Sequence, residues 1–113
     1  MEILQKKKLL KLASKNIGNT KLIKAINDLI ESIEEANWKS ELELVESRTD
    51  ADCVHNDGFY FFDINIHRTM ILMLFDDSEA EIMWVGTHDE YKRIFKSNKR
   101  TIERWLRNQG KIK

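Results

Sequence analysis

Three apolar stretches separated by short polar turns constrain the fold of this chain more than any other feature. The stretches cover residues 59–64, 69–75 and 80–85, and the turns between them are Asn65–Arg68 and Asp76–Glu79. Aromatic and β-branched residues favour strands, and the first stretch is apolar on both faces, which indicates a buried central strand. Turns this short join antiparallel neighbours. We therefore predict a three-strand antiparallel meander that needs helices on one face to cover it.

Two helices are predicted before the meander. Residues 21–36 place apolar side chains at the i, i+3, i+4, i+7 spacing of a helix with one buried face. Residues 6–16 predict a shorter, lysine-rich helix, in which Lys7 and Lys11 are candidate contacts to phosphate. Residues 1–4 fit either a short strand or the start of a helix.

A further helix closes the chain. Asn98 can cap it, and Gly110 suits its C-terminal end. Its basic face is a candidate RNA-binding surface, formed by Arg100, Arg104 and Arg107. Residues 37–57 show no clean period. We predict an α+β fold in one domain, residues 1–113: a small antiparallel sheet of three to four strands packed against N-terminal and C-terminal helices, with helix 98–110 as an extension.

Charge is segregated along the chain although the formal net charge is zero. Residues 1–24 carry a net charge of +6 and residues 91–113 a net charge of +8, whereas the middle is acidic. Two interpretations stay open: the basic ends meet in one phosphate-facing surface, or they are solvated helix faces without a partner. The lone Cys53, with no long apolar run and no signal-peptide pattern, leads us to expect a reduced, cytoplasmic setting and no contact with a membrane.

A strand-to-helix junction follows the last apolar stretch. The strand is predicted to break at Gly86, and Thr87 with Glu90 forms a capping-box pattern at the start of a helix. His88 then lies in the first helical turn, where unpaired N–H groups and the helix dipole favour anions. Tyr91 continues the helix on its buried side. This polar junction is a plausible place for chemistry.

The meander also predicts which polar residues converge. If the Asp76–Glu79 turn centres its hairpin, Arg68 faces Thr87 and lies next to His88. The preceding hairpin turns at the same end of the sheet. We therefore expect a cluster at one sheet edge, composed of Asn65, His67, Arg68, His88 and Tyr91.

This set of side chains suits RNA cleavage without a metal ion. The guanidinium of Arg68 presents a fork of donors to a phosphate, and His88 can accept the proton of a 2′-hydroxyl. Tyr91 can donate to a phosphate or stack on a base, and Asn65 and His67 are candidate RNA contacts. Cleavage by 2′-hydroxyl attack would leave a 2′,3′-cyclic phosphate.

Structural roles remain open for the same residues. Asn65 and His67 can simply shape a tight turn, and Tyr91 can be core with its hydroxyl at the rim. His88 can merely occupy the first helical turn, while Arg68 can pair with an acid, of which the candidates are Asp63, Asp89 and Glu90. The candidate zinc ligands are Cys53, His55, His67 and His88. We reject a zinc site because no two of them have the short spacing of a metal-binding motif.

The order of these motifs resembles a known family. Thr87-His88 followed by Glu90-Tyr91 is similar to the Thr-His-x-Glu-Tyr signature of HigB-type toxins, which belong to the RelE/ParE superfamily of bacterial toxin–antitoxin systems. The similarity extends upstream through Asn65-x-x-Arg68, the strand 59–64 and Ala51-Asp52-x-Val54.

The resemblance implies a RelE-like fold and the activity of a ribosome-dependent mRNA endonuclease in the bacterial cytoplasm. The implied partners are mRNA on the ribosome and a cognate HigA-like antitoxin with a helix-turn-helix domain, the free toxin being a monomer. The implied roles are contact with RNA or phosphate for Arg68, acid–base work for His88 and Tyr91, and capping for Thr87 and Glu90. Neither a cofactor nor a metal ion is expected.

The chain departs from the family pattern at three places. Ile64 runs straight into Asn65 where relatives usually have a glycine pair, so the hairpin is shorter. Asn56-Asp57-Gly58 replaces a basic residue often found before the strand, and the basic helix extends past the usual end of the family. The superfamily also contains gyrase poisons, so two alternatives to mRNA cleavage remain: a gyrase-inhibiting toxin and a catalytically silent RNA-binding module.

Overall fold

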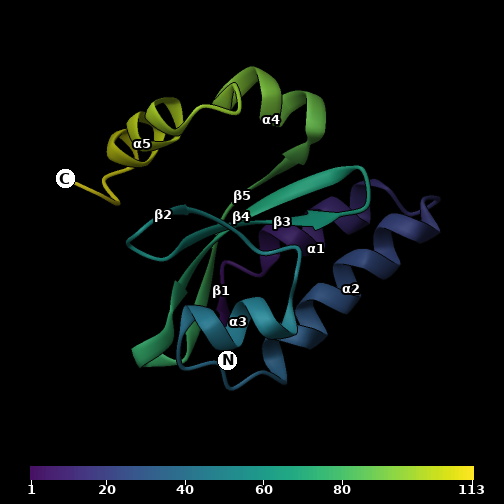
Figure 1. Cartoon of the computed structure of the whole chain (residues 1–113). Coiled ribbons are helices and arrows are strands. Elements are labelled where there is room, and N and C mark those ends of the chain that lie inside the picture. Colours follow the sequence, from purple (N-terminus) through teal and green to yellow (C-terminus); the bar gives the residue numbers. More distant parts are fainter.

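A five-stranded mixed sheet lies between two sets of helices in the computed structural model, which describes residues 1–113 (Figure 1). The sheet order is β1-β5-β4-β3-β2. The elements in chain order are β1 (Glu2–Leu4), α1 (Lys7–Lys15), α2 (Thr20–Glu34), α3 (Glu41–Ser47), β2 (Asp52–His55), β3 (Phe59–Ile64), β4 (His67–Leu74), the short 3-10 helix η1 (Phe75–Asp77), β5 (Glu79–Thr87), α4 (His88–Phe95) and α5 (Lys99–Asn108). None of the helices is both long enough and apolar enough to cross a membrane.

The predicted meander is confirmed as β3, β4 and β5, and the α+β class is confirmed with it. Two short strands enlarge the sheet beyond the predicted three to four strands. The N-terminal β1 pairs with β5 in parallel, which makes the sheet mixed and not purely antiparallel, and β2 adds an antiparallel edge next to β3. Both are too short to carry a readable alternation of apolar and polar residues.

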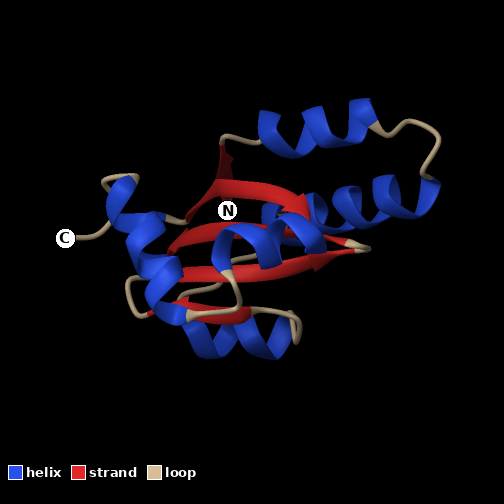
Figure 2. Ribbon diagram, turned by 90° about the horizontal axis from the view of Figure 1, so that it is seen from above, coloured by secondary structure: helices blue, strands red, loops and turns tan.

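Helices cover both faces of the sheet, whereas the sequence led us to expect cover on one. The side chains of Tyr60, Phe62 and Ile64 pack with α1, α2 and α3 on one face. Phe59 and Phe61 alternate with them and pack with α4 and α5 on the other. Figure 1 shows this division, and Figure 2 looks onto the face that α4 and α5 cross. β3 therefore contributes side chains to both cores. Each fully buried aromatic or aliphatic side chain stabilises the folded state by about 1.5–3 kcal/mol.

The helix starts follow from side-chain caps. The Asn19 side chain accepts a hydrogen bond from the Leu22 N–H at 3.1 Å, and the Asn98 side chain accepts from the N–H of Arg100 at 2.9 Å. At α4 the predicted capping box is complete: Thr87 Oγ1 accepts from the Glu90 N–H at 3.0 Å, and Glu90 Oε1 accepts from the Thr87 N–H at 2.9 Å. Such caps contribute about 1 kcal/mol each and fix where α4 leaves β5.

Candidate functional site

Two chain segments meet at one end of the sheet. Arg68 pairs with Gly86 and His67 with Thr87, one residue away from the register expected from the sequence. The backbone N–H of His88 donates to the Ile66 carbonyl at 3.2 Å, which joins the start of α4 to the β3–β4 turn. The cluster therefore lies at the ends of central strands and not along an edge of the sheet.

Arg68 is held on three sides. It lies directly across from Asp63 in the β3–β4 ladder, and its Nε donates to Asp63 Oδ1 at 3.1 Å. Its Nη2 lies 3.7 Å from Asp52 Oδ2. The guanidinium carbon sits 4.6 Å from the centre of the Tyr91 ring and 5.1 Å from that of Phe61, both within the range of a cation–π contact. The side chain is 13% exposed, so the charge is fixed in place but still reaches the surface.

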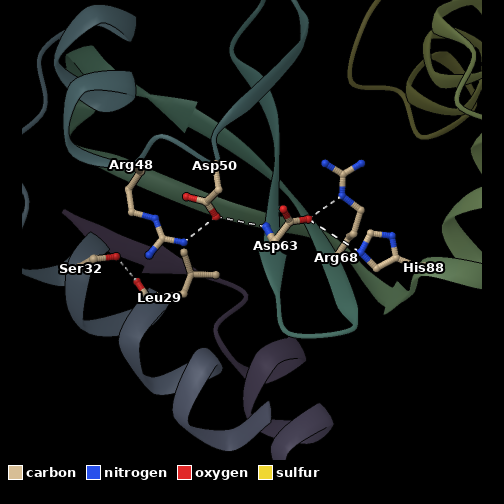
Figure 3. Close-up of polar contacts among 7 residues, drawn as sticks. All are labelled: Leu29, Ser32, Arg48, Asp50, Asp63, Arg68 and His88. Atoms are coloured by element: carbon tan, nitrogen blue, oxygen red, sulfur yellow. Dashed lines mark hydrogen bonds and ion pairs between the residues drawn. The ribbon is translucent and has the colours of Figure 1, made fainter. Parts of the chain in front are cut away.

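His88 approaches the same carboxylate from α4. Its Nε2 lies 3.9 Å from Asp63 Oδ1, the oxygen that also accepts from Arg68, as Figure 3 shows. The His88 side chain is 46% exposed and stands in the first turn of the helix. Arg68 and His88 thus converge on one point that is open to solvent.

A second ion pair anchors the strand that carries Asp63. The Asp63 backbone N–H donates to Asp50 Oδ2 at 3.2 Å, and the same oxygen lies 2.8 Å from Arg48 Nη2 (Figure 3). This anchor involves only the main chain of Asp63. The Asp63 side chain, which is 51% exposed, contacts Arg68 and His88 and takes no part in this anchor.

The structure gives Asn65 and His67 a structural role, and their contact with RNA stays a prediction. Asn65 is exposed and has a φ of 63°, the left-handed conformation that asparagine tolerates in tight turns. His67 is only 6% exposed, and its Nδ1 has no hydrogen-bond partner. Burial lowers the pKa of His67 and the neighbouring His88 lowers it further, while Glu90 opposes the shift. A buried neutral imidazole is a poor direct ligand for a phosphate.

The lowered pKa of His67 gives an expected pH dependence of stability. The unfolded state binds a proton near the ordinary pKa of 6.5, whereas the folded state binds it only at lower pH. The contribution of His67 is therefore complete above pH 6.5 and is lost as the pH falls from there towards the lowered folded pKa. We expect the free energy of unfolding, measured in urea between pH 7.5 and pH 5, to fall less steeply for His67→Gln than for the unchanged protein. Equal slopes would contradict this assignment, since Glu90, whose pKa is lowered from 4.5, acts only at more acidic pH.

The basic helices do not combine into one surface, because α1 and α5 pack on opposite faces of the sheet. Along α5 the arginines lead away from the site. Arg107 lies beside His55 and Asp57 at the far end of the sheet, while Lys99 lines a small hollow with Asp52 and Tyr91. Arg100 and Arg104 are exposed between these ends.

A basic groove lies between α1 and β5. Lys11 lines it, as do two lysines that the sequence did not single out, Lys8 and Lys15. Its other wall is β5, at Met83, Trp84 and Val85, and its volume is 340 Å³. Lys8 Nζ also donates to the Met83 carbonyl at 3.4 Å. The signal for this groove was present in the i, i+3, i+7 spacing of the three lysines, whereas Lys7 is exposed outside it.

Comparison with known proteins assigns most of the chain to one family. A family model described as the RelE-like toxic component of a toxin–antitoxin system, HigB toxin, matches residues 23–94. The match runs from α2 through α4 and includes Asp63, Arg68, His88 and Tyr91, but leaves out α1 and α5. A search among curated proteins found no significant match.

Proposed function

Because the chain belongs to the HigB family of RelE-like toxins, we propose that it is a metal-independent endonuclease that cuts messenger RNA. The family makes it the toxin of a toxin–antitoxin system and implies a cognate antitoxin. The observation that carries the nuclease proposal is the convergence of Arg68 Nε and His88 Nε2 on a single oxygen of Asp63, at 3.1 and 3.9 Å. That arrangement of a fixed guanidinium beside an exposed imidazole suits a phosphodiester.

The proposed reaction is a transesterification within the RNA. His88 accepts the proton of the 2′-hydroxyl, the 2′-oxygen bonds to phosphorus, and the bond from phosphorus to the 5′-oxygen breaks. The 5′-oxygen leaves with a proton from water or from the Tyr91 hydroxyl. The products are a 2′,3′-cyclic phosphate and a 5′-hydroxyl end, so atoms and charge balance without a cofactor.

Arg68 stabilises the charge that develops on the phosphate. Its guanidinium lies over the rings of Tyr91 and Phe61, so little reorganisation is needed when the phosphate arrives. Tyr91 is itself 8% exposed, and the position of its ring under Arg68 makes it a support for the guanidinium in this proposal.

The basic groove on α1 extends the proposed binding surface. Its three lysines suit contact with the phosphates of the RNA backbone. In this proposal the message is bound in the decoding site of the ribosome, in the bacterial cytoplasm, and the antitoxin is HigA-like with a helix-turn-helix domain.

The groove lysines are expected to set the salt dependence of RNA binding. Changing Lys8, Lys11 and Lys15 together to glutamine removes up to three phosphate contacts, so the slope of log K against log salt should become shallower by about two to three. The measurement is fluorescence anisotropy of a labelled RNA at several salt concentrations. A triple change at Lys21, Lys24 and Lys39, outside the groove, is the matched control, and an equal change of slope there would exclude the groove as the site.

Inducible expression in a bacterium, with 5′-end mapping of transcripts, tests the function directly. We expect growth arrest and cuts within translated frames for the unchanged chain, and neither for the folded double variant Arg68→Ala/His88→Ala. Growth arrest with intact transcripts and DNA damage would overturn the nuclease proposal in favour of gyrase inhibition. If the unchanged chain causes no growth arrest and no cleavage, the remaining interpretation is a catalytically silent RNA-binding module.

A further inference from the structure

The Asp63 carboxylate occupies the point where the two proposed site residues converge. Its Oδ1 lies 3.1 Å from Arg68 Nε and 3.9 Å from His88 Nε2, while its backbone is fixed separately by Asp50. We propose that Asp63 stands in for the scissile phosphate in the free protein, and that the phosphate must displace it to bind. This inference rests on the proposed function, in which Arg68 binds that phosphate and His88 accepts the proton of the adjacent 2′-hydroxyl.

The chemistry of the contact supports a stand-in. A carboxylate and a phosphodiester are both anions with two acceptor oxygens on one central atom, and an arginine fork can donate to both oxygens of either group. A phosphate oxygen placed between Arg68 and His88 would meet Asp63 Oδ1 in the position that it needs. Two negative charges in contact repel each other, so the phosphate and the Asp63 carboxylate cannot both lie between Arg68 and His88.

The position of Asp63 allows it to leave. Its side chain is 51% exposed, and only Arg68 and His88 hold it. The Arg68 side chain, by contrast, is 13% exposed and packs over the rings of Tyr91 and Phe61, so its guanidinium stays in place when the carboxylate swings out. The distance from Arg68 Nη2 to Asp52 Oδ2 is 3.7 Å, too long for a hydrogen bond. Asp52 nevertheless adds a second negative charge near the Arg68 guanidinium.

The sequence explains why this acid lies at the site. Asp63 and Arg68 are cross-strand partners two positions from the β3–β4 turn, so their side chains leave the sheet on the same side. The turn residues Asn65 and Ile66 complete a short hairpin that holds the two partners in direct opposition. The alternative role for Asp63 is to orient Arg68 for the substrate, and the two roles predict opposite effects when its charge is removed.

Titration with inorganic phosphate, followed by NMR of the Arg68 Nε–H and the His88 ring signals, tests the inference. For Asp63→Asn we expect phosphate to bind about five- to tenfold more tightly than to the unchanged protein. The matched control is Asp76→Asn, which removes the same charge at the opposite end of the sheet and should change affinity less than about twofold. In Arg68→Ala the Asp63→Asn change should give no gain, since the fork is absent.

Equal or weaker phosphate binding by folded Asp63→Asn would overturn the stand-in and assign Asp63 to the positioning of Arg68. RNA cleavage is measured in parallel, so the two proposals fail separately. Tighter phosphate binding with no RNA cleavage by any variant would defeat the nuclease proposal alone. Cleavage by the unchanged protein, without tighter binding in Asp63→Asn, would defeat the stand-in alone.

Discussion

Replacing Arg68 by alanine is expected to slow RNA cleavage by about 10²–10³-fold, the loss typical of removing one donor that stabilises transition-state charge. No other arginine forms an ion pair with Asp63, and the ring faces of Tyr91 and Phe61 hold the Arg68 guanidinium in place. The rate should be measured by single-turnover cleavage of a translated message. Arg68→Lys keeps the charge but loses the fork, and we expect it to recover only a small part of the rate.

Stability separates this catalytic role from a structural one. Arg68 also forms ion pairs with Asp63 and Asp52, but both carboxylates are about half exposed, so their loss should cost only about 1 kcal/mol or less. The alanine variant should therefore remain folded at the temperature of the assay. Arg93, an exposed arginine on α4, is the matched control, and Arg93→Ala should cut RNA at an unchanged rate. A similar loss of rate in both variants would point to a general effect of charge and would contradict the role given to Arg68.

The double variant Arg68→Ala/His88→Ala should be little slower than the worse single variant. Residues that act together on one transition state give effects that do not add. Effects that multiply would instead show that the two side chains act in separate steps.

The meander, and its register to within one residue, were accessible from the sequence because local rules decide them. Turn residues lie between long apolar strands, and the capping box of Thr87 and Glu90 sets the start of α4. These features brought Arg68, His88 and Tyr91 into one neighbourhood within one residue of the observed pairing. The parallel β1 was not accessible, because its pairing with β5 depends on residues about 77 positions apart in the chain and not on any local pattern.

The burial of the polar site residues could not be predicted from the sequence. His67 and Arg68 are adjacent in the sequence and lie on opposite faces of β4, yet both side chains are largely buried, with 6% and 13% exposed. The sequence placed both in the turn 65–68, whereas β4 already begins at His67, so both remained surface candidates. Asp63 appeared only as one of several acids that can pair with Arg68. Its approach to His88 depends on the angle at which α4 leaves the sheet, which no sequence pattern specifies.

Gly86 shows how an apparent strand break can instead be a packing requirement. The strand continues through it to Thr87, and a side chain at this position would collide with an aromatic ring. A Cβ at Gly86 would fall 2.7 Å from Cη2 of Trp84 and closer still to Cζ2. The Trp84 ring cannot move aside easily, because it forms T-shaped pairs with Phe95 and Phe61, at 5.1 Å and 6.3 Å between ring centres.

Gly86→Ala is therefore expected to lower the free energy of unfolding by about 2–3 kcal/mol, measured by urea denaturation. Gly18→Ala is the matched control, since a Cβ there meets nothing within 4 Å and the change should be neutral or slightly stabilising. If the collision with Trp84 is the cause, Gly86→Ala should cost at least about 1 kcal/mol less in a Trp84→Leu background than in the unchanged protein. An equal cost in both backgrounds would place the requirement for glycine in the backbone of β5 and not in the ring. Gly86 is the cross-strand partner of Arg68, so Gly86→Ala should also shift the NMR signal of the Arg68 Nε–H. Such a shift would show that the packing of β5 affects the position of the Arg68 side chain.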